Sequence, residues 1–365
     1  MPMTRRHMIP WCFLGLILNS GLTWLTKPSQ AGENPVKDVV LTIASQADHS
    51  LIKHGDPGTE GNKYGFEGGS VVKLNGAYHL FTSEMIGDPR WVKMRLAHWV
   101  SLDAITWRRE ATLYESSGNF DGTDRRAALW APMPVFNDKS DRWEMFYVAY
   151  RCAPDTPEKW FGNYEGRIWR AVSNRPGRQS IGGPYKDVGV ILEPGKDSDP
   201  WEGLQGTDSF YPYKVGNLWY GFYGTARTEV KPPAYWKVGL VSAPDLSGPW
   251  KRLSDRNPVP LDAQNGVENP IVTRLKSGQY VAVFDTIERP DRIGYAVSRD
   301  GLKWAPARYL VLDKAKLWTK DVRTPLGLVP EDDGTFTIFY TGYFDQPGYG
   351  TYGGVSVITV KAEDR

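Results

Sequence analysis

The 365-residue chain has little cysteine, little histidine and no excess of either charge. With only Cys12 and Cys152, it has no disulfide framework, and Cys152 is predicted to be a buried apolar side chain rather than a nucleophile. The 5 histidines show no metal-ligand spacing, so no metal site is predicted. The 44 basic and 42 acidic residues nearly cancel, which leaves no electrostatic footprint for nucleic acid or an anionic membrane.

Residues 1–31 have the pattern of a secretory signal peptide. Arg5 and Arg6 precede an apolar run over residues 9–25, and small residues follow up to Ala31. We expect cleavage after Ala31 and a secreted or periplasmic protein that is not bound to a membrane. An uncleaved anchor is the alternative, although a proline and polar residues interrupt the run. Both the Sec and the twin-arginine export routes stay open.

Residue types that favour strands and turns are abundant. The chain has 15 Trp, 19 Tyr and 13 Phe together with 38 Gly and 27 Pro. Aromatic residues favour strands, whereas glycine and proline favour tight turns. An all-β protein is therefore predicted.

One pattern recurs along the chain: a polar residue, an apolar strand, a turn, and then an aromatic-rich strand. Copies begin at Phe66, Leu129, Gly206, Val267 and Val322. Several are followed by a small-residue strand and a Ser/Ala-Asp-Trp signature, which makes about four strands a unit. Radially repeated four-stranded sheets form a β-propeller, whereas a β-sandwich would not explain the repeat.

We therefore predict a single five-bladed propeller domain over residues 32–365. A strand near residues 39–45 is expected to complete the blade that begins at Val322. The loop-rich segments 153–164 and 193–203 are expected at the mouth of the propeller.

Residues at the head of each unit converge in a propeller, because each innermost strand starts at the central tunnel. These heads are Glu67, Trp130, Asp208, Glu268 and Arg323. Neighbouring carboxyl groups raise one another's pKa values. The cluster would thus supply the protonated acid and the ionised base that hydrolysis of a glycosidic bond requires.

The sequence resembles the five-bladed propeller glycosidases of glycoside hydrolase family 43 and its relatives, families 32, 62 and 117. The resemblance covers residues 64–345 and rests on Glu67, Trp130-Ala131-Pro132, Asp208 and Glu268-Asn269-Pro270. It implies that Glu67 is the general base and Glu268 the general acid. Asp208 would set the orientation and the pKa of the acid.

Three positions depart from the family pattern: Glu67 stands in place of Asp, Met133 in place of a frequent Asp, and Arg323 in place of a frequent His. The resemblance favours inversion of configuration. The longer Glu67 side chain would narrow the gap of about 6.5 to 9.5 Å between the carboxyl groups of an inverting enzyme, so retention stays open.

Four residues are candidates for substrate binding: Trp130, Arg323, Asn269 and Tyr211. The Trp130 indole either stacks on a sugar or packs in the core. The Arg323 guanidinium either binds a hydroxyl or carboxylate of the substrate or neutralises the acid cluster.

These features predict a secreted, monomeric glycoside hydrolase that acts on plant or algal poly- and oligosaccharides. No cofactor is expected, and a calcium ion in the tunnel stays open. Two alternatives remain: a non-catalytic carbohydrate-binding propeller, and a phosphorylase or lyase on the same scaffold. The latter needs a cluster of cations, of which the heads offer Arg323 alone.

Overall fold

A computed structural model describes residues 38–287, 289–346 and 350–364, so the predicted signal peptide lies outside the described residues. The described part contains twenty β-strands and two short 3-10 helices, η1 (Arg178–Gly182) and η2 (Lys314–Lys316). None of its helices is long and apolar enough to cross a membrane. The prediction of an all-β protein is confirmed.

Three antiparallel sheets contain four strands each, and each follows the order of the sequence from one edge to the other. The first comprises β6 (Ala128–Asn137), β7 (Arg142–Arg151), β8 (Tyr164–Ser173) and β9 (Tyr185–Leu192). The second comprises β10 (Asp208–Val215), β11 (Leu218–Arg227), β12 (Ala234–Ala243) and β13 (Lys251–Arg252). The third comprises β14 (Val267–Arg274), β15 (Tyr280–Thr286), β16 (Arg292–Ser298) and β17 (Arg308–Val311).

A fourth sheet has eight strands and divides into two antiparallel groups. One group is β2 (Gly65–Leu74), β3 (Ala77–Met85), β4 (Met94–Ser101) and β5 (Arg108–Glu115). The other is β18 (Asp321–Pro330), β19 (Phe336–Gln346), β20 (Gly350–Asp364) and β1 (Val39–Gln46). Because β1 pairs with β20, the prediction that a strand from the amino-terminal part joins the unit begun at Val322 is confirmed.

The two groups meet at one parallel pair, Gly65 with Gly353. A Cβ atom on Gly65 would lie 2.0 Å from the carbonyl oxygen of Gly353. The backbones are therefore too close for any side chain at this crossing.

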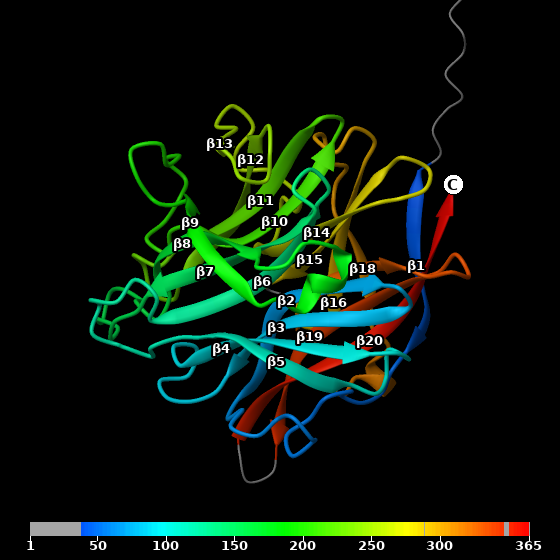
Figure 1. Cartoon of the computed structure of the whole chain (residues 1–365), viewed down its shortest axis with the longest axis horizontal. Helices are drawn as coiled ribbons and strands as arrows, with labels where there is room; N and C mark the ends of the chain where they lie inside the picture. The colour runs from blue at the N-terminus through cyan, green and yellow to red at the C-terminus, as the bar shows by residue number, and fades with distance from the viewer. Residues whose placement is uncertain (1–37, 288, 347–349, 365) are drawn as a thin grey trace, which may run out of the picture. The chain divides into compact units, whose positions relative to one another are not determined.

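The first strands of the five groups contact one another in a cycle, β18 with β2, β2 with β6, β6 with β10, β10 with β14, and β14 with β18. Figure 1 shows these strands meeting near the middle of the described part. Each of the five sequence repeats starts within a few residues of one of these strands.

Burial is high in the second strands of the groups and low in an outer strand. In β7, every residue between the two terminal arginines is buried, which fits a strand covered on both faces. Outer strand β5 alternates between exposed and partly buried residues, as a strand with one solvent face does. The apolar core therefore lies between the sheets and around the five inner strands.

Candidate active site

Every head residue lies at or beside a β-bulge near the start of an inner strand. The register shifts fall between Glu67 and Gly69, Trp130 and Met133, Asp208 and Phe210, Glu268 and Ile271, and Val322 and Pro325. A bulge bends its strand and changes the direction of the neighbouring side chains. A bulge therefore lies beside the head residue in each of the five groups.

The residue that follows the head has a left-handed backbone in four of the five groups. The φ angles are 67° at Gly68, 51° at Ala131, 39° at Ser209 and 53° at Asn269. This conformation is unfavourable for residues with a Cβ atom and is concentrated at functional sites. The backbone strain thus coincides with the predicted site.

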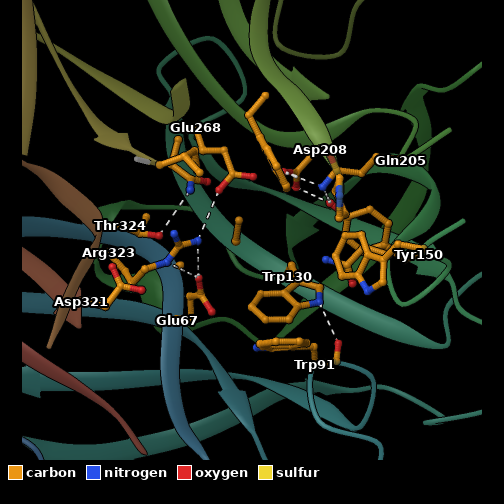
Figure 2. A pocket seen from close by; sticks show the side chains of 18 of the residues that line it. Glu67, Trp91, Trp130, Tyr150, Gln205, Asp208, Glu268, Asp321, Arg323 and Thr324 are labelled. Atoms are coloured by element: carbon orange, nitrogen blue, oxygen red, sulfur yellow. Dashed lines mark hydrogen bonds and ion pairs between the residues drawn. The ribbon is translucent and has the colours of Figure 1, made fainter. Parts of the chain in front are cut away.

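The heads line one cavity of about 460 Å³. Six of the seven predicted site residues contribute to its wall: Glu67, Trp130, Asp208, Glu268, Asn269 and Arg323. Figure 2 shows the three carboxyl groups of Glu67, Asp208 and Glu268 around the same space. The convergence expected from the repeat is present.

Arg323 connects the acidic residues of this cavity. Its Nε and Nη2 atoms donate to Oε1 of Glu67 at 3.2 and 3.1 Å. Its Nη2 also lies 3.6 Å from Oε2 of Glu268, and its Nη1 lies 3.5 Å from Oδ2 of Asp285. Burial acts to lower the pKa of Arg323, but these carboxylates raise it overall. The guanidinium therefore stays charged.

The Arg323 contacts limit how far apart Glu67 and Glu268 can lie. The two distances from Nη2 place Oε1 of Glu67 and Oε2 of Glu268 no more than 6.7 Å apart. Both guanidinium bonds to Glu67 go to Oε1, so Arg323 does not hold Oε2.

Burial raises the pKa of Glu268 well above its ordinary value, and the negative charges of Asp208, Asp285 and Glu67 add to this effect. The positive charge of Arg323 opposes it. A raised pKa favours the protonated form of a carboxyl group. Glu268 is therefore suited to donate a proton.

Asp208 lies across the cavity and has a smaller shift. Burial raises its pKa to about 6, while hydrogen bonds from the Tyr150 hydroxyl and the Ser209 backbone act to lower it. Gln205 donates a further hydrogen bond from Nε2 at 3.3 Å. These donors fix the orientation of the carboxylate and favour its ionised form.

Tyr211 is the predicted site residue that does not line the cavity. It is buried, and its hydroxyl donates to Oδ1 of Asn269 at 3.0 Å. Asn269 in turn donates from Nδ2 to Oγ1 of Thr324 at 3.3 Å. Tyr211 therefore reaches the cavity wall through its hydrogen bond to Asn269, and its role in substrate binding stays a prediction.

Several lining residues were missed by the sequence analysis, among them Trp91, Tyr150, Gln205, Asp321 and Trp236. Tyr150 ends an aromatic strand of the second repeat, but nothing in that run distinguishes it from its neighbours. Asp285, which contacts Arg323, had a usable signal, because it is the cross-strand partner of Glu268 in the β14–β15 hairpin.

The two loop-rich segments differ in their contribution. Segment 153–164 supplies Trp160 and Asn163 to the wall of the cavity, as expected, whereas no residue of segment 193–203 lines it.

Cys152 is fully buried, and burial raises its pKa, which agrees with the predicted apolar role. In the part of the chain that the structure describes, no group of three or more His, Cys, Asp or Glu residues is arranged to hold a metal ion.

No known protein family and no curated protein matches the sequence. Solved structures do match the fold. Zg3597, a family 117 glycoside hydrolase of the marine bacterium Zobellia galactanivorans, has a TM-score of 0.59 at 13% identity, over 89% of this chain and 91% of its own. BT0996, in a complex with RGII, has a TM-score of 0.61 at 15% identity, over 87% of this chain and 92% of its own.

A GH43_1 enzyme from Xanthomonas citri, complexed with xylose, has a TM-score of 0.54 at 15% identity, over 87% of this chain and 90% of its own. The resemblance to propeller glycosidases is thus confirmed at the level of the fold. This chain has the propeller-like, all-β architecture that glycosidases of several families share.

Proposed function

We propose that this protein is a glycoside hydrolase built on a five-bladed β-propeller, in which each four-stranded group is one blade. The cycle of contacts among the five inner strands supports this blade count. The observation that carries the function is the meeting of Glu67, Asp208 and Glu268 in one cavity from three different inner strands.

Glu268 is the general acid in this proposal. Its raised pKa keeps a proton available for the oxygen of the leaving group, and its contact with Arg323 fixes the carboxyl group. Asp208 contributes a nearby negative charge that helps to keep the proton on Glu268. This separation of roles between neighbouring carboxyl groups is the usual requirement of glycoside hydrolysis.

Glu67 is the base that activates water. Arg323 holds Oε1, and Oε2 is the oxygen that accepts the proton of the water. The limit of 6.7 Å between the Glu67 and Glu268 oxygens admits both the lower end of the inverting range, about 6.5 to 9.5 Å, and the shorter retaining separation. We propose inversion. The retaining alternative, at about 5 to 5.5 Å, would make Glu67 a nucleophile.

A sugar is the proposed substrate because aromatic side chains surround the acids. The lining includes Trp91, Trp130, Trp160, Trp236 and Tyr343, which offer flat apolar faces to the C–H faces of sugar rings. The xylose complex of the Xanthomonas citri enzyme and the RGII complex of BT0996 support carbohydrate as the ligand class. Secretion and a monomeric state remain predictions from the sequence.

The test is hydrolysis of a panel of aryl glycosides and of plant and algal oligosaccharides, starting with xylo-oligosaccharides and RGII fragments. Glu268→Gln should lower turnover by about 10²- to 10⁴-fold on substrates with poor leaving groups, and by much less on dinitrophenyl glycosides, which need little protonation. Glu115→Gln is the matched control, because Glu115 is an exposed residue of β5 that pairs with Lys93 at 2.7 Å. Equal turnover by wild type and Glu268→Gln would contradict the acid role.

The base is tested by Glu67→Gly, which should be nearly inactive and should regain turnover with azide or formate in the vacated space. Proton NMR of the first-formed product then identifies its anomer. Retention of configuration would assign Glu67 as the nucleophile instead, and full activity of Glu67→Gly would remove it from the site. Sugar binding without any turnover would favour the non-catalytic alternative.

A further inference from the structure

The turn over residues 86–93, between β3 and β4, presents an indole that the proposed catalytic chemistry does not use. Trp91 is 36% exposed, more than any other Trp, Tyr or Phe residue whose burial is described, and it lines the cavity. Its backbone φ is 68°, in the left-handed region that bulky residues avoid. An exposed tryptophan on a strained backbone gains little from packing, and such strain is typical of ligand-binding positions.

The neighbouring Arg90 and Tyr343 of β19 hold the Trp91 indole in one orientation. The Arg90 guanidinium lies 5.0 Å from the centre of the Trp91 ring and 5.1 Å from that of Tyr343. Nε1 of Trp91 donates to the hydroxyl of Tyr343 at 3.4 Å, and its carbonyl oxygen accepts a hydrogen bond from Nε1 of Trp130 at 3.1 Å. A ring fixed in this way loses little conformational entropy when a ligand stacks on it.

Trp91 lies beyond Trp130 as seen from Asp208 and Glu268 in Figure 2. Figure 2 shows Trp130 between Trp91 and the side of the cavity that carries Asp208 and Glu268. The cavity of about 460 Å³ falls in the range that holds ligands larger than one sugar ring. Trp91 is therefore placed to contact a unit next to the one that the acids attack.

We propose that Trp91, held by Arg90 and Tyr343, is the stacking platform of a second sugar subsite, so that the preferred ligand contains at least two linked sugar units. This inference rests on the proposed glycosidase function, because it takes a sugar as the ligand. Arg90 and Tyr343 are positioning residues that act through the indole.

The experiment measures binding on an array of plant and algal oligosaccharides graded from one to four units, with Glu268→Gln as the background that prevents turnover. In that background, affinity should rise from one unit to two. Trp91→Ala should remove this rise and weaken binding of the longer members about tenfold, whereas Trp91→Phe should keep part of it, because a smaller ring still stacks.

Trp219→Ala is the matched control. Trp219 is a partly buried indole of β11 that also has a cation over its ring, Lys214 at 5.8 Å, but it does not line the cavity. This variant should bind as the background does. Circular dichroism shows whether each variant is folded. If Trp91→Ala does not fold, Trp91→Phe alone tests whether the rise in affinity from one unit to two depends on the Trp91 ring.

The outcomes separate the two proposals. Turnover by wild type together with an unchanged length dependence in Trp91→Ala and Trp91→Phe would refute the subsite alone. Length-dependent binding that requires Trp91, without turnover by wild type, would refute the hydrolase proposal and support the subsite. Absence of binding to every member of the array would overturn the subsite.

Discussion

Asp208→Asn should stabilise the folded protein at neutral pH while impairing its activity. Burial raises the pKa of Asp208 from an ordinary 3.8 to about 6. Between these two values the folded state binds the proton more tightly than the unfolded state, so the free energy of unfolding falls as pH rises. The penalty is absent below pH 3.8 and complete above pH 6. At about 1.36 kcal/mol per pKa unit, it reaches about 3 kcal/mol.

An asparagine carries no charge, so the variant avoids this penalty. Its amide oxygen can still accept the hydrogen bond that the Tyr150 hydroxyl donates to Asp208. We therefore expect Asp208→Asn to match its parent near pH 3.5 and to exceed it by up to about 3 kcal/mol at pH 7. Both proteins should carry Glu268→Gln, because the charge of Asp208 also raises the pKa of Glu268.

The assay is urea denaturation of the parent and the variant at several pH values between 3.5 and 7.5. Asp103→Asn provides a control of opposite sign, because backbone hydrogen bonds from Thr106 and Ile105 lower the pKa of Asp103 to about 2. That variant should lose stability relative to its parent as pH rises from about 2 to 3.8 and show no further change above that, so its series extends down to pH 2. A difference between Asp208→Asn and its parent that does not change with pH, or a variant that is less stable than its parent at pH 7 but not at pH 3.5, would refute the reasoning.

Three further changes test other parts of the structure. Gly65→Ala should lower the melting temperature far more than Gly76→Ala, because both glycines have a positive φ but only the former would clash with a facing backbone; equal losses would contradict the close approach. Tyr150→Phe removes a hydrogen bond that lowers the pKa of Asp208, so the acid limb of kcat/KM should move to higher pH, and an unmoved profile would assign Tyr150 to packing. Burial lowers the pKa of His98 to about 3, so wild type should lose stability as pH falls below 6.5, and His98→Phe should lose less between pH 7.5 and pH 5. An equal loss of stability with falling pH in both proteins would show that His98 is not its cause.

The sequence was sufficient for the strand content and for the three acids. Aromatic strands, turn residues and the five repeats predict the groups of strands, because strand patterning is local. Glu67, Asp208 and Glu268 could be selected because each occupies the same place in its repeat, and the inner strands bring these places together. To predict that the three side chains converge, the arrangement of the five inner strands was enough.

Residues that reach the cavity from elsewhere had no such signal. Trp91 comes from a turn, and Tyr150 comes from the end of a second strand. Whether these side chains face the cavity depends on packing between sheets, which no local pattern encodes. Tyr211 lies close to Asp208 in the sequence, but its side chain does not line the cavity and contacts Asn269 instead.

In four of the five inner strands, the residue after the head has a left-handed backbone, although its type differs from strand to strand. Gly68, Ala131, Ser209 and Asn269 have no side-chain chemistry in common, yet they share a positive φ beside a bulge. Three of the four have a Cβ atom, so the surrounding contacts must hold them in place. At Asn269 these contacts are the hydrogen bonds to Tyr211 and Thr324. The bulge and the positive φ together set the direction of the head side chain. Because four different residue types adopt this conformation, the geometry of the cavity does not depend on one residue type after the head.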